Sequence, residues 1–175
     1  MMLKLVRTPG IYLAGFMGSG KTMVGKLLAD RLGWNFIDLD AVIEAEQGTS
    51  IASIFETRGE EHFRQLETEA IRKRMRTVRT GVPMVVALGG GAFLRPENFE
   101  MLRENGVTVW LDCPFETVRQ RVAVNADRPL ARDPKRFEEL YHARRPLYAK
   151  ADYRIEILSD NPELAVGAIC RLPIF

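Results

Sequence analysis

The sequence predicts an α/β fold in which helices cover both faces of a parallel β-sheet. Short apolar runs alternate along the chain with longer segments of helical periodicity, which is the order expected when crossover helices join parallel strands. The runs are apolar at successive positions, as is typical of strands buried on both faces. A glycine-rich segment at residues 15–22 separates the first apolar run from the first helical pattern, and phosphate-binding loops occupy this position in such folds.

Five strands are predicted from these runs, at residues 12–14, 35–37, 84–88, 107–111 and 154–158. The first helix is marked by Val24, Leu27, Leu28 and Leu32, and a second amphipathic pattern covers about residues 60–75. Later helices should begin at or beside prolines, which fit the first helical turn, namely Pro96, Pro114, Pro134 and Pro162. In the last helix, the side chains expected to face inward are Leu164, Ala165, Ala168 and Ile169. Because ligands of parallel sheets bind beyond the carboxyl ends of the strands, functional residues should directly follow the strands.

The composition narrows the possible functions. A chain of 175 residues, 46% of them hydrophobic and 27% charged, fits one domain over residues 1–175. No apolar run approaches the roughly 20 residues that cross a bilayer, and a net charge of +2 does not favour nucleic acid as a partner. The basic residues between 72 and 79 fit the end of a helix, where cations are favoured.

Cys113 and Cys170 form neither a disulfide framework nor a zinc pattern, so we expect a cytoplasmic protein. No segment indicates an interface, and we expect a monomer.

The segment from Gly15 to Thr22 matches the pattern G-x-x-x-x-G-K-[ST] of a nucleotide-binding phosphate loop. Its glycines allow unusual backbone angles and let amide groups approach phosphate oxygens. A helix that begins near Lys21 directs free N–H groups and a partial positive charge at the same anion. Lys21 can reach the β- and γ-phosphates, and the Thr22 hydroxyl can coordinate Mg²⁺. The chain carries no Asn-Lys-x-Asp guanine-reading motif and is short for a molecular motor, which favours a compact small-molecule kinase.

Two aspartates, Asp38 and Asp40, stand at the end of the second predicted strand. On an extended strand, residues two apart share a face. One carboxylate can then organise Mg²⁺ and its waters, while the other accepts a proton from the acceptor hydroxyl. The alternative interpretation is turn formation and helix capping, with Asp40 as the N-cap of the helix that follows. The pair alone does not decide between them.

Three further features fit an acceptor that carries a carboxylate. Arg64 and Arg144 each offer a planar guanidinium suited to bidentate capture of a carboxylate, although a lone arginine is more often in a surface ion pair. Because Arg145 is adjacent to Arg144, only the register of the motif selects one of them. The three glycines at residues 89–91 follow a buried strand and let backbone amides approach a substrate, or else form a simple tight turn.

Taken together, these segments resemble shikimate kinase. The matching pieces occur in the family's order: GFMGSGKT at 15–22, FIDLD at 36–40, FRQLE at 63–67, LGGG at 88–91, RPL at 128–130 and RRPLY at 144–148. The resemblance implies transfer of the ATP γ-phosphoryl group to the 3-hydroxyl of shikimate, in the pathway to chorismate and the aromatic amino acids. It also implies a three-layer P-loop kinase fold with a five-stranded parallel sheet in the order 2-3-1-4-5. Gluconate kinase or another small-acid kinase is the alternative, since it shares the loop and the fold.

The resemblance also implies roles for individual residues. Asp40 is expected to act as the catalytic base, assisted by Lys21 and Arg128. The expected ATP-binding residues are Gly18, Ser19, Gly20, Lys21, Thr22, Met23, Arg121 and Arg128. The expected shikimate-binding residues are Asp40, Arg64, Gly89, Gly90, Gly91 and Arg144, within or beside an acceptor-binding region at about residues 40–72. Phe55, Phe63 and Glu67 are expected to line or brace that pocket. One Mg²⁺ is expected at Thr22 and, through water, at Asp38.

Two departures from the family's pattern affect these expectations. The expected lid, at about residues 124–135, is a few residues shorter than in many relatives and reads Pro-Leu-Ala after Arg128. Asp160 stands where some relatives carry a basic residue near the adenine. The acidic residue is therefore expected to alter nucleotide affinity or selectivity.

Overall fold

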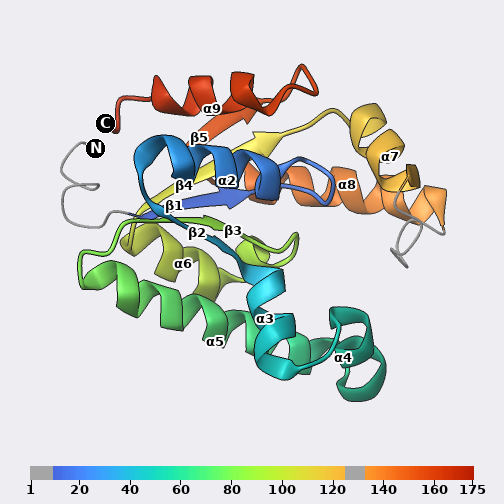
Figure 1. Cartoon of the computed structure of the whole chain (residues 1–175). Coiled ribbons are helices and arrows are strands. Elements are labelled where there is room, and N and C mark those ends of the chain that lie inside the picture. Colours follow the sequence, from blue (N-terminus) through green and yellow to red (C-terminus); the bar gives the residue numbers. More distant parts are fainter. Residues whose placement is uncertain (1–9, 125–132) are drawn as a thin grey trace.

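The computed structural model of the protein describes residues 10–124 and 133–175. Its centre is a parallel sheet with the strand order β2-β3-β1-β4-β5, drawn in Figure 1. The strands are β1 (Gly10–Ala14), β2 (Asn35–Asp38), β3 (Met84–Ala87), β4 (Val107–Asp112) and β5 (Tyr153–Glu156). The predicted sheet and its order are confirmed.

Burial follows the position of each strand in the sheet. Every residue of β1, β3 and β4 is buried, whereas the edge strands β2 and β5 are partly exposed. The three central strands therefore carry the unbroken apolar runs that made them recognisable. β5 begins one residue before the expected strand and ends two residues earlier than expected. Leu158, at the end of the expected strand, is 81% exposed.

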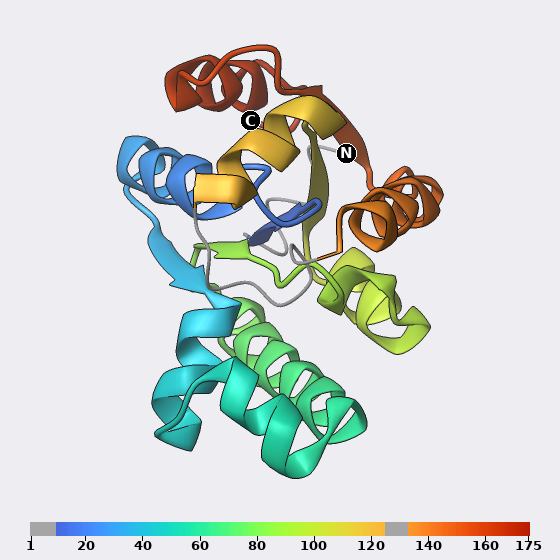
Figure 2. The same ribbon diagram turned by 90° about the vertical axis from the view of Figure 1, so that its right-hand side faces the viewer.

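Helices cover both faces of the sheet, as predicted. In Figures 1 and 2, α2 and α9 lie on one face, and α5, α6 and α8 lie on the other. The helices are α2 (Lys21–Leu32), α3 (Leu39–Gln47), α4 (Ile51–Arg58), α5 (Glu60–Arg79), α6 (Pro96–Glu104), α7 (Phe115–Val124), α8 (Pro134–Tyr148) and α9 (Pro162–Cys170), with a 3₁₀ turn η1 (Ala92–Leu94). Proline occupies the first turn of α6, α8 and α9, so the proline signals are confirmed there.

Two details differ from the sequence-based expectation. The helix α4 was not predicted, because Ile54 is its one fully buried residue and its apolar pattern is weak. In α9 the buried residues are Ala165, Val166 and Ile169, whereas Leu164 is 60% exposed. The expectation that Leu164 faces inward was wrong, since the small apolar residues of α9 permit a contact stripe one position further along the helix.

The basic segment at the end of α5 is a solvated helix end, as expected. Arg72 pairs with Glu69 one turn earlier, and Lys73 and Arg74 pair with Glu46 of α3. These ion pairs place acidic side chains beside three of the basic residues, which weakens the attraction of this surface for a polyanion. The contacts instead join α3 to α5, which together with α4 form the arm that extends from the sheet in Figures 1 and 2.

Candidate functional site

The phosphate loop joins β1 to α2 at the carboxyl end of the central strand. Gly18 and Gly20 have φ angles of 79° and 93°, a left-handed conformation that a residue with a side chain rarely adopts. Gly20 is the N-cap of α2, so the free amide groups of the helix begin at Lys21. The Lys21 ammonium donates hydrogen bonds to the carbonyls of Gly15 and Phe16, at 2.8 and 3.0 Å. The side chain thus folds back over the loop where a phosphate chain would lie.

The remaining residues expected at the phosphate loop occupy different environments. Ser19 is buried inside the loop, and its amide donates to the carbonyl of Phe16 at 3.1 Å. Met23 lies in the first turn of α2 with 58% of its surface exposed. Ser19 therefore contributes to the shape of the loop, whereas Met23 presents an apolar surface beside it.

Thr22 and Asp38, the two expected metal ligands, lie together. The Thr22 hydroxyl donates to Asp38 Oδ2 at 2.6 Å, which joins the start of α2 to the end of β2. A hydroxyl and a carboxylate are oxygen donors of the kind that Mg²⁺ accepts, with water and phosphate oxygens completing its shell. Within the described ranges 10–124 and 133–175, no group of three or more His, Cys, Asp or Glu side chains forms another candidate metal site. The residues present fit a magnesium ion held largely by the nucleotide.

Asp38 and Asp40 do not share the face of a strand, so this part of the prediction was wrong. β2 ends at Asp38, and Asp40 lies in the first turn of α3. The proposed capping role was also assigned to the wrong residue, because Asp38 is the N-cap and its Oδ1 accepts from the amides of Asp40 and Ala41 at 3.1 and 3.2 Å. The cap holds one carboxylate on the metal side of the turn. It leaves Asp40 to point elsewhere, toward the glycines that follow β3.

Asp40 and Glu67 converge on the first of these glycines. A Cβ atom at Gly89 would lie 2.6 Å from Asp40 Oδ1 and 2.9 Å from Glu67 Oε1, so only glycine fits between the two carboxyl groups. Glu67 is 1% exposed. Burial raises its pKa, Arg64 opposes that change, and the nearby charge of Asp40 raises the pKa further. The carboxyl groups of Asp40 and Glu67 therefore lie side by side at Gly89.

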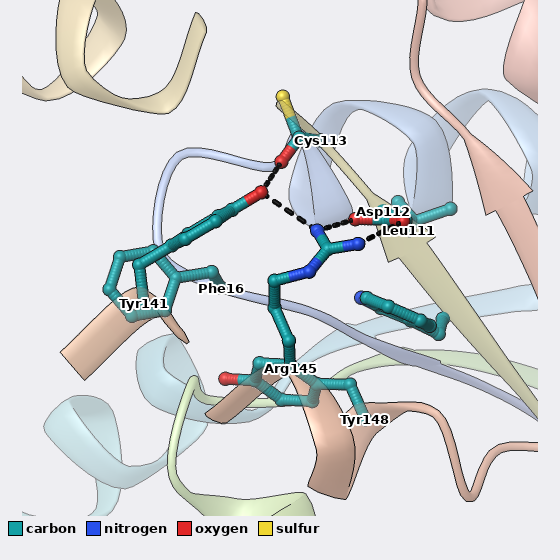
Figure 3. A pocket seen from close by; sticks show the side chains of 8 residues that line it. Phe16, Leu111, Asp112, Cys113, Tyr141, Arg145 and Tyr148 are labelled. Atoms are coloured by element: carbon teal, nitrogen blue, oxygen red, sulfur yellow. Dashed lines mark hydrogen bonds and ion pairs between the residues drawn. The ribbon is translucent and has the colours of Figure 1, made fainter. Parts of the chain in front are cut away.

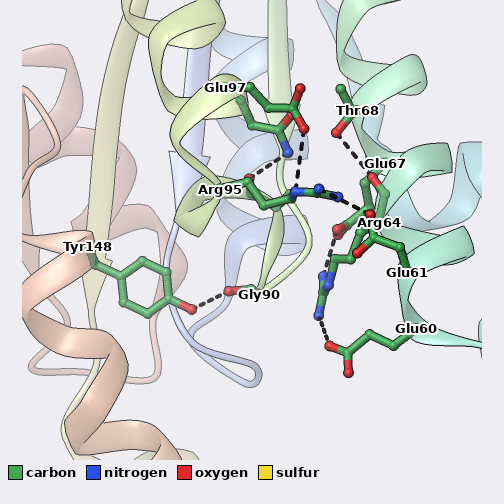
Figure 4. A network of polar contacts seen from close by, with 11 residues as sticks. Glu60, Glu61, Arg64, Glu67, Thr68, Gly90, Arg95, Glu97 and Tyr148 are labelled. Carbon is green, nitrogen blue, oxygen red and sulfur yellow. Dashed lines mark hydrogen bonds and ion pairs between the residues drawn. The ribbon is translucent and has the colours of Figure 1, made fainter.

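Arg64 of α5 approaches the glycine loop, which is formed by residues 89–91 after β3. Its Nη1 donates to Glu67 Oε2 at 2.6 Å and its Nη2 to Glu60 Oε1 at 3.3 Å, and Figure 4 shows the three side chains together. A Cβ atom at Gly91 would lie 2.3 Å from Arg64 Nη1. The absence of a side chain at Gly91 is therefore what admits the guanidinium to the loop.

The two adjacent arginines of α8 point in different directions. Arg144 faces the glycine loop, because a Cβ atom at Gly90 would lie 3.3 Å from its Nη1. Its guanidinium also lies 5.8 Å from the centroid of the Phe16 ring, beside the phosphate loop. Arg144 therefore belongs to the site together with Gly90 and Arg64.

Arg145 is instead part of a structural network at the end of β4, shown in Figure 3. It forms a two-pronged ion pair with the buried Asp112, whose Oδ2 it reaches at 2.9 Å. It also donates to the Tyr141 hydroxyl at 2.8 Å, and that hydroxyl donates to the carbonyl of Cys113 at 2.7 Å. Arg154 of β5 pairs with the same Asp112. This network attaches α8 to the sheet and was not predicted, since Arg145 and Arg154 lie 33 and 42 residues from Asp112 in sequence.

Arg121 of α7 lies against the phosphate loop. Its Nη1 donates to the carbonyl of Gly18 at 3.0 Å and its Nη2 to Asp160 at 2.7 Å. Asp160 itself is largely exposed, with a side-chain exposure of 87%. Asp160, which departs from the family's pattern, is therefore the partner of Arg121, which was expected near the adenine. Arg128 and most of the expected lid, residues 125–132, lie outside the described residues.

The fold and this site define a P-loop kinase that acts on a small molecule. The family model described as shikimate kinase matches residues 17–171 of the chain. The chain belongs to the shikimate kinase family, and it is an ATP-dependent kinase.

Individual relatives agree with this assignment. The shikimate kinase of Persephonella marina is 43% identical over 160 residues, covering 91% of this chain and 95% of the relative. The shikimate kinase of Caldanaerobacter subterraneus subsp. tengcongensis is 45% identical over 164 residues, covering 92% and 94%. The structure of shikimate kinase from Acinetobacter baumannii in complex with shikimate superposes with a TM-score of 0.87 at 35% identity, covering 98% of this chain and 96% of that one.

Within the described parts of the chain, none of the helices combines the length and apolarity that a membrane span requires.

Proposed function

We propose that this protein transfers the γ-phosphoryl group of ATP to the 3-hydroxyl of shikimate, giving shikimate 3-phosphate and ADP. The observation that carries the proposal is the meeting of Asp40, Arg64 and Arg144 around the glycine loop, beside the phosphate loop. Two guanidinium groups and one carboxylate suit an acceptor that has both a carboxylate and hydroxyl groups. The membership of the chain in the shikimate kinase family supports this choice of acceptor.

On the donor side, the loop amides, the N-terminus of α2 and the ammonium of Lys21 would hold the β- and γ-phosphates. Lys21 rests on the Gly15 and Phe16 carbonyls, and it would exchange these neutral acceptors for phosphate oxygens. Phosphoryl transfer needs alignment and charge neutralisation more than covalent help. The remaining ATP-binding assignments, to Gly18, Ser19, Gly20, Met23 and Arg121, follow from their positions in or against the loop.

Thr22 and Asp38 would hold one Mg²⁺, the aspartate through water. The ion would supply positive charge to the phosphates of the bound nucleotide. The 2.6 Å hydrogen bond between the two side chains supports this assignment, because it keeps both oxygen donors directed at one point. Arg128 would add positive charge from the lid, an assignment that rests on the RPL segment at 128–130 alone.

On the acceptor side, Arg64 and Arg144 would bind the shikimate carboxylate, with Gly89, Gly90 and Gly91 contacting the substrate through their backbone. Asp40 would accept the proton of the reacting hydroxyl. Its position at the first turn of α3, next to Gly89, supports this role. A carboxylate placed there can bind a hydroxyl group and remove its proton as the phosphoryl group arrives.

We further propose that the protein acts as a monomer in the cytoplasm. Cys113 and Cys170 are free thiols, which suits a reducing compartment. Size-exclusion chromatography with light scattering would measure the assembly state, and a stable dimer that is required for activity would contradict this proposal.

The deciding experiment for the function is a panel of acceptors, assayed by ADP release with ATP and Mg²⁺. We expect turnover with shikimate and little with gluconate or other sugar acids. Strong turnover with gluconate and none with shikimate would overturn the proposal in favour of a gluconate-kinase-like activity. A control without acceptor measures the hydrolysis of ATP by water.

A further inference from the structure

Tyr148, the last residue of α8, makes a polar contact at the centre of the site although its ring belongs to the core. The side chain is 1% exposed. Its ring lies 6.4 Å from the ring of Phe93 and 6.3 Å from that of Trp110, measured between centroids. Its hydroxyl donates a hydrogen bond of 2.5 Å to the carbonyl of Gly90, as Figure 4 shows. A core residue thus reaches the glycine loop with its one polar atom.

The same hydroxyl also meets Arg144, one helical turn earlier on α8. Residues four positions apart share one face of a helix. A Cβ atom at Gly90 would lie 3.3 Å from Arg144 Nη1 and 3.9 Å from Tyr148 Oη, so the three groups surround one point. Burial raises the pKa of Tyr148 to about 12, although the positive charge of the nearby Arg144 acts in the opposite direction. The phenol therefore stays protonated and donates over the physiological pH range.

The contact constrains both partners. A peptide group is planar and trans, so the carbonyl of Gly90 and the amide N–H of Gly91 point in opposite directions. When Tyr148 holds the carbonyl, it also directs the Gly91 amide away from the phenol. Glycine has more backbone freedom than any other residue, so three glycines in succession at residues 89–91 would lose much entropy on ordering. A buried hydroxyl bonded to the middle glycine reduces that freedom before the substrate arrives.

We propose that Tyr148 is a positioning residue for the acceptor, because its hydroxyl holds the Gly90 carbonyl and the Arg144 guanidinium in the arrangement that binds the substrate carboxylate. This inference rests on the proposed function of Gly90 and Arg144. It adds a group that contacts neither substrate but sets the geometry of two groups that do. The RRPLY segment at 144–148 contains the residue, but its spacing alone assigns it only to the helix.

Tyr148→Phe tests the proposal, since it removes the hydroxyl and keeps the ring packed against Phe93 and Trp110. We expect the KM for shikimate to rise about tenfold, because a buried carbonyl loses its donor and the guanidinium loses a neighbour. The KM for ATP should change by less than about twofold. A KM for shikimate equal to that of the wild type would overturn the inference.

Tyr12→Phe is the matched control. Tyr12 is fully buried, and its hydroxyl donates to the carbonyl of Asn105 at 2.8 Å. Asn105 is the C-cap of α6 and lies two residues before β4, at the amino ends of the strands and opposite the site. Both variants should lower the melting temperature, but only Tyr148→Phe should raise the KM for shikimate. Equal rises in both variants would indicate a general loss of rigidity and would also overturn the inference.

A double-mutant cycle with Arg144→Ala separates this inference from the function on which it rests. If Tyr148 acts through Arg144, the effect of Tyr148→Phe on shikimate binding should be much smaller in the Arg144→Ala background. Full additivity would overturn the inference while leaving the acceptor clamp intact. If Arg144→Ala itself leaves shikimate binding unchanged, the proposed clamp fails, and the positioning role of Tyr148 fails with it.

Discussion

The donor end and the acceptor end of the site are built in different ways. The phosphate loop is one continuous segment, and within it Lys21 bonds to carbonyls five and six residues earlier. The proposed acceptor pocket takes Asp40 from α3, Arg64 from α5, three glycines from the loop after β3, and Arg144 from α8. One end is a backbone cradle between two consecutive elements, β1 and α2. The other is a set of side chains that meet only when four separate segments have reached their positions.

The two ends also handle charge differently. At the donor end, the Lys21 ammonium donates to the carbonyls of Gly15 and Phe16, and phosphate oxygens can take the place of these two acceptors. At the acceptor end, Arg64 is already paired with the buried Glu67 at 2.6 Å. Arg64 is therefore held in place by a buried partner in the absence of substrate. We expect substitutions at the donor end to act mainly through ATP, and those at the acceptor end to reveal long-range couplings.

The largest expected effect comes from Asp40→Asn, which tests whether the two ends act independently in binding. The amide cannot accept the hydroxyl proton, so kcat should fall about a thousandfold. The affinity for ATP, measured by calorimetry, should stay within about twofold of the wild type, because the phosphate loop is complete without Asp40. An equal loss of ATP binding would show that the ends are not separable.

Arg144→Ala and Arg145→Ala form a matched pair with the next largest effect. Loss of Arg144 should weaken shikimate binding by about 2–4 kcal/mol, the cost of leaving a desolvated carboxylate without its partner. Loss of Arg145 should leave shikimate binding nearly unchanged and lower the melting temperature, because the buried Asp112 loses its two-pronged partner. Shikimate titrations and thermal unfolding of both variants check this. The reverse pattern would assign the clamp to Arg145.

Glu67→Gln tests the charge arrangement at the acceptor end through pH. Burial raises the pKa of Glu67 above its ordinary value of about 4.3. Its protonated form favours the folded state, so this contribution to stability is full below the unfolded pKa and is lost as the pH rises through the folded pKa. Glutamine does not titrate. The free energy of unfolding of Glu67→Gln should therefore increase relative to that of the wild type as the pH rises from 4 upward, so that the variant becomes relatively more stable.

Urea unfolding without substrate, at several pH values, measures this difference. Glu60→Gln is the matched control, since it removes the exposed carboxylate that pairs with the same Arg64. A relative stability of Glu67→Gln that stays constant or falls with pH would contradict the prediction.

Asp160→Asn should give the smallest effect, at the donor end. It removes a negative charge from the neighbourhood of the phosphate loop and frees Arg121 from an exposed ion pair, which is worth little in water. The KM for ATP should fall by about two- to threefold, more at low ionic strength, with the KM for shikimate unchanged. Glu163→Gln on α9 is the control, because its carboxylate pairs with Arg31 instead. A rise in the KM for ATP would mean that Asp160 serves mainly to hold Arg121 in place.

Much of the fold was readable from the sequence because its signals are local. The buried strands β1, β3 and β4 appear as unbroken apolar runs, and the prolines of α6, α8 and α9 mark helix starts at the residues observed. The weakly apolar α4 escaped prediction, and Leu164 was assigned to the wrong side of α9. The helix α4 has few apolar side chains to define a face, whereas α9 is apolar at most positions. In both cases the face that packs inward is decided by tertiary packing.

The sequence by itself determined the donor end, since a phosphate loop needs only the right residues at the right spacing between a strand and a helix. Only the tertiary structure decided which aspartate caps α3, which of two adjacent arginines faces the glycine loop, and that the Tyr148 hydroxyl reaches the carbonyl of Gly90. The physical reason is the range of the interactions involved. Backbone angles and helix starts depend on neighbours in sequence, whereas the direction of a side chain depends on partners such as Asp112 and Gly90, which are 33 and 58 residues away.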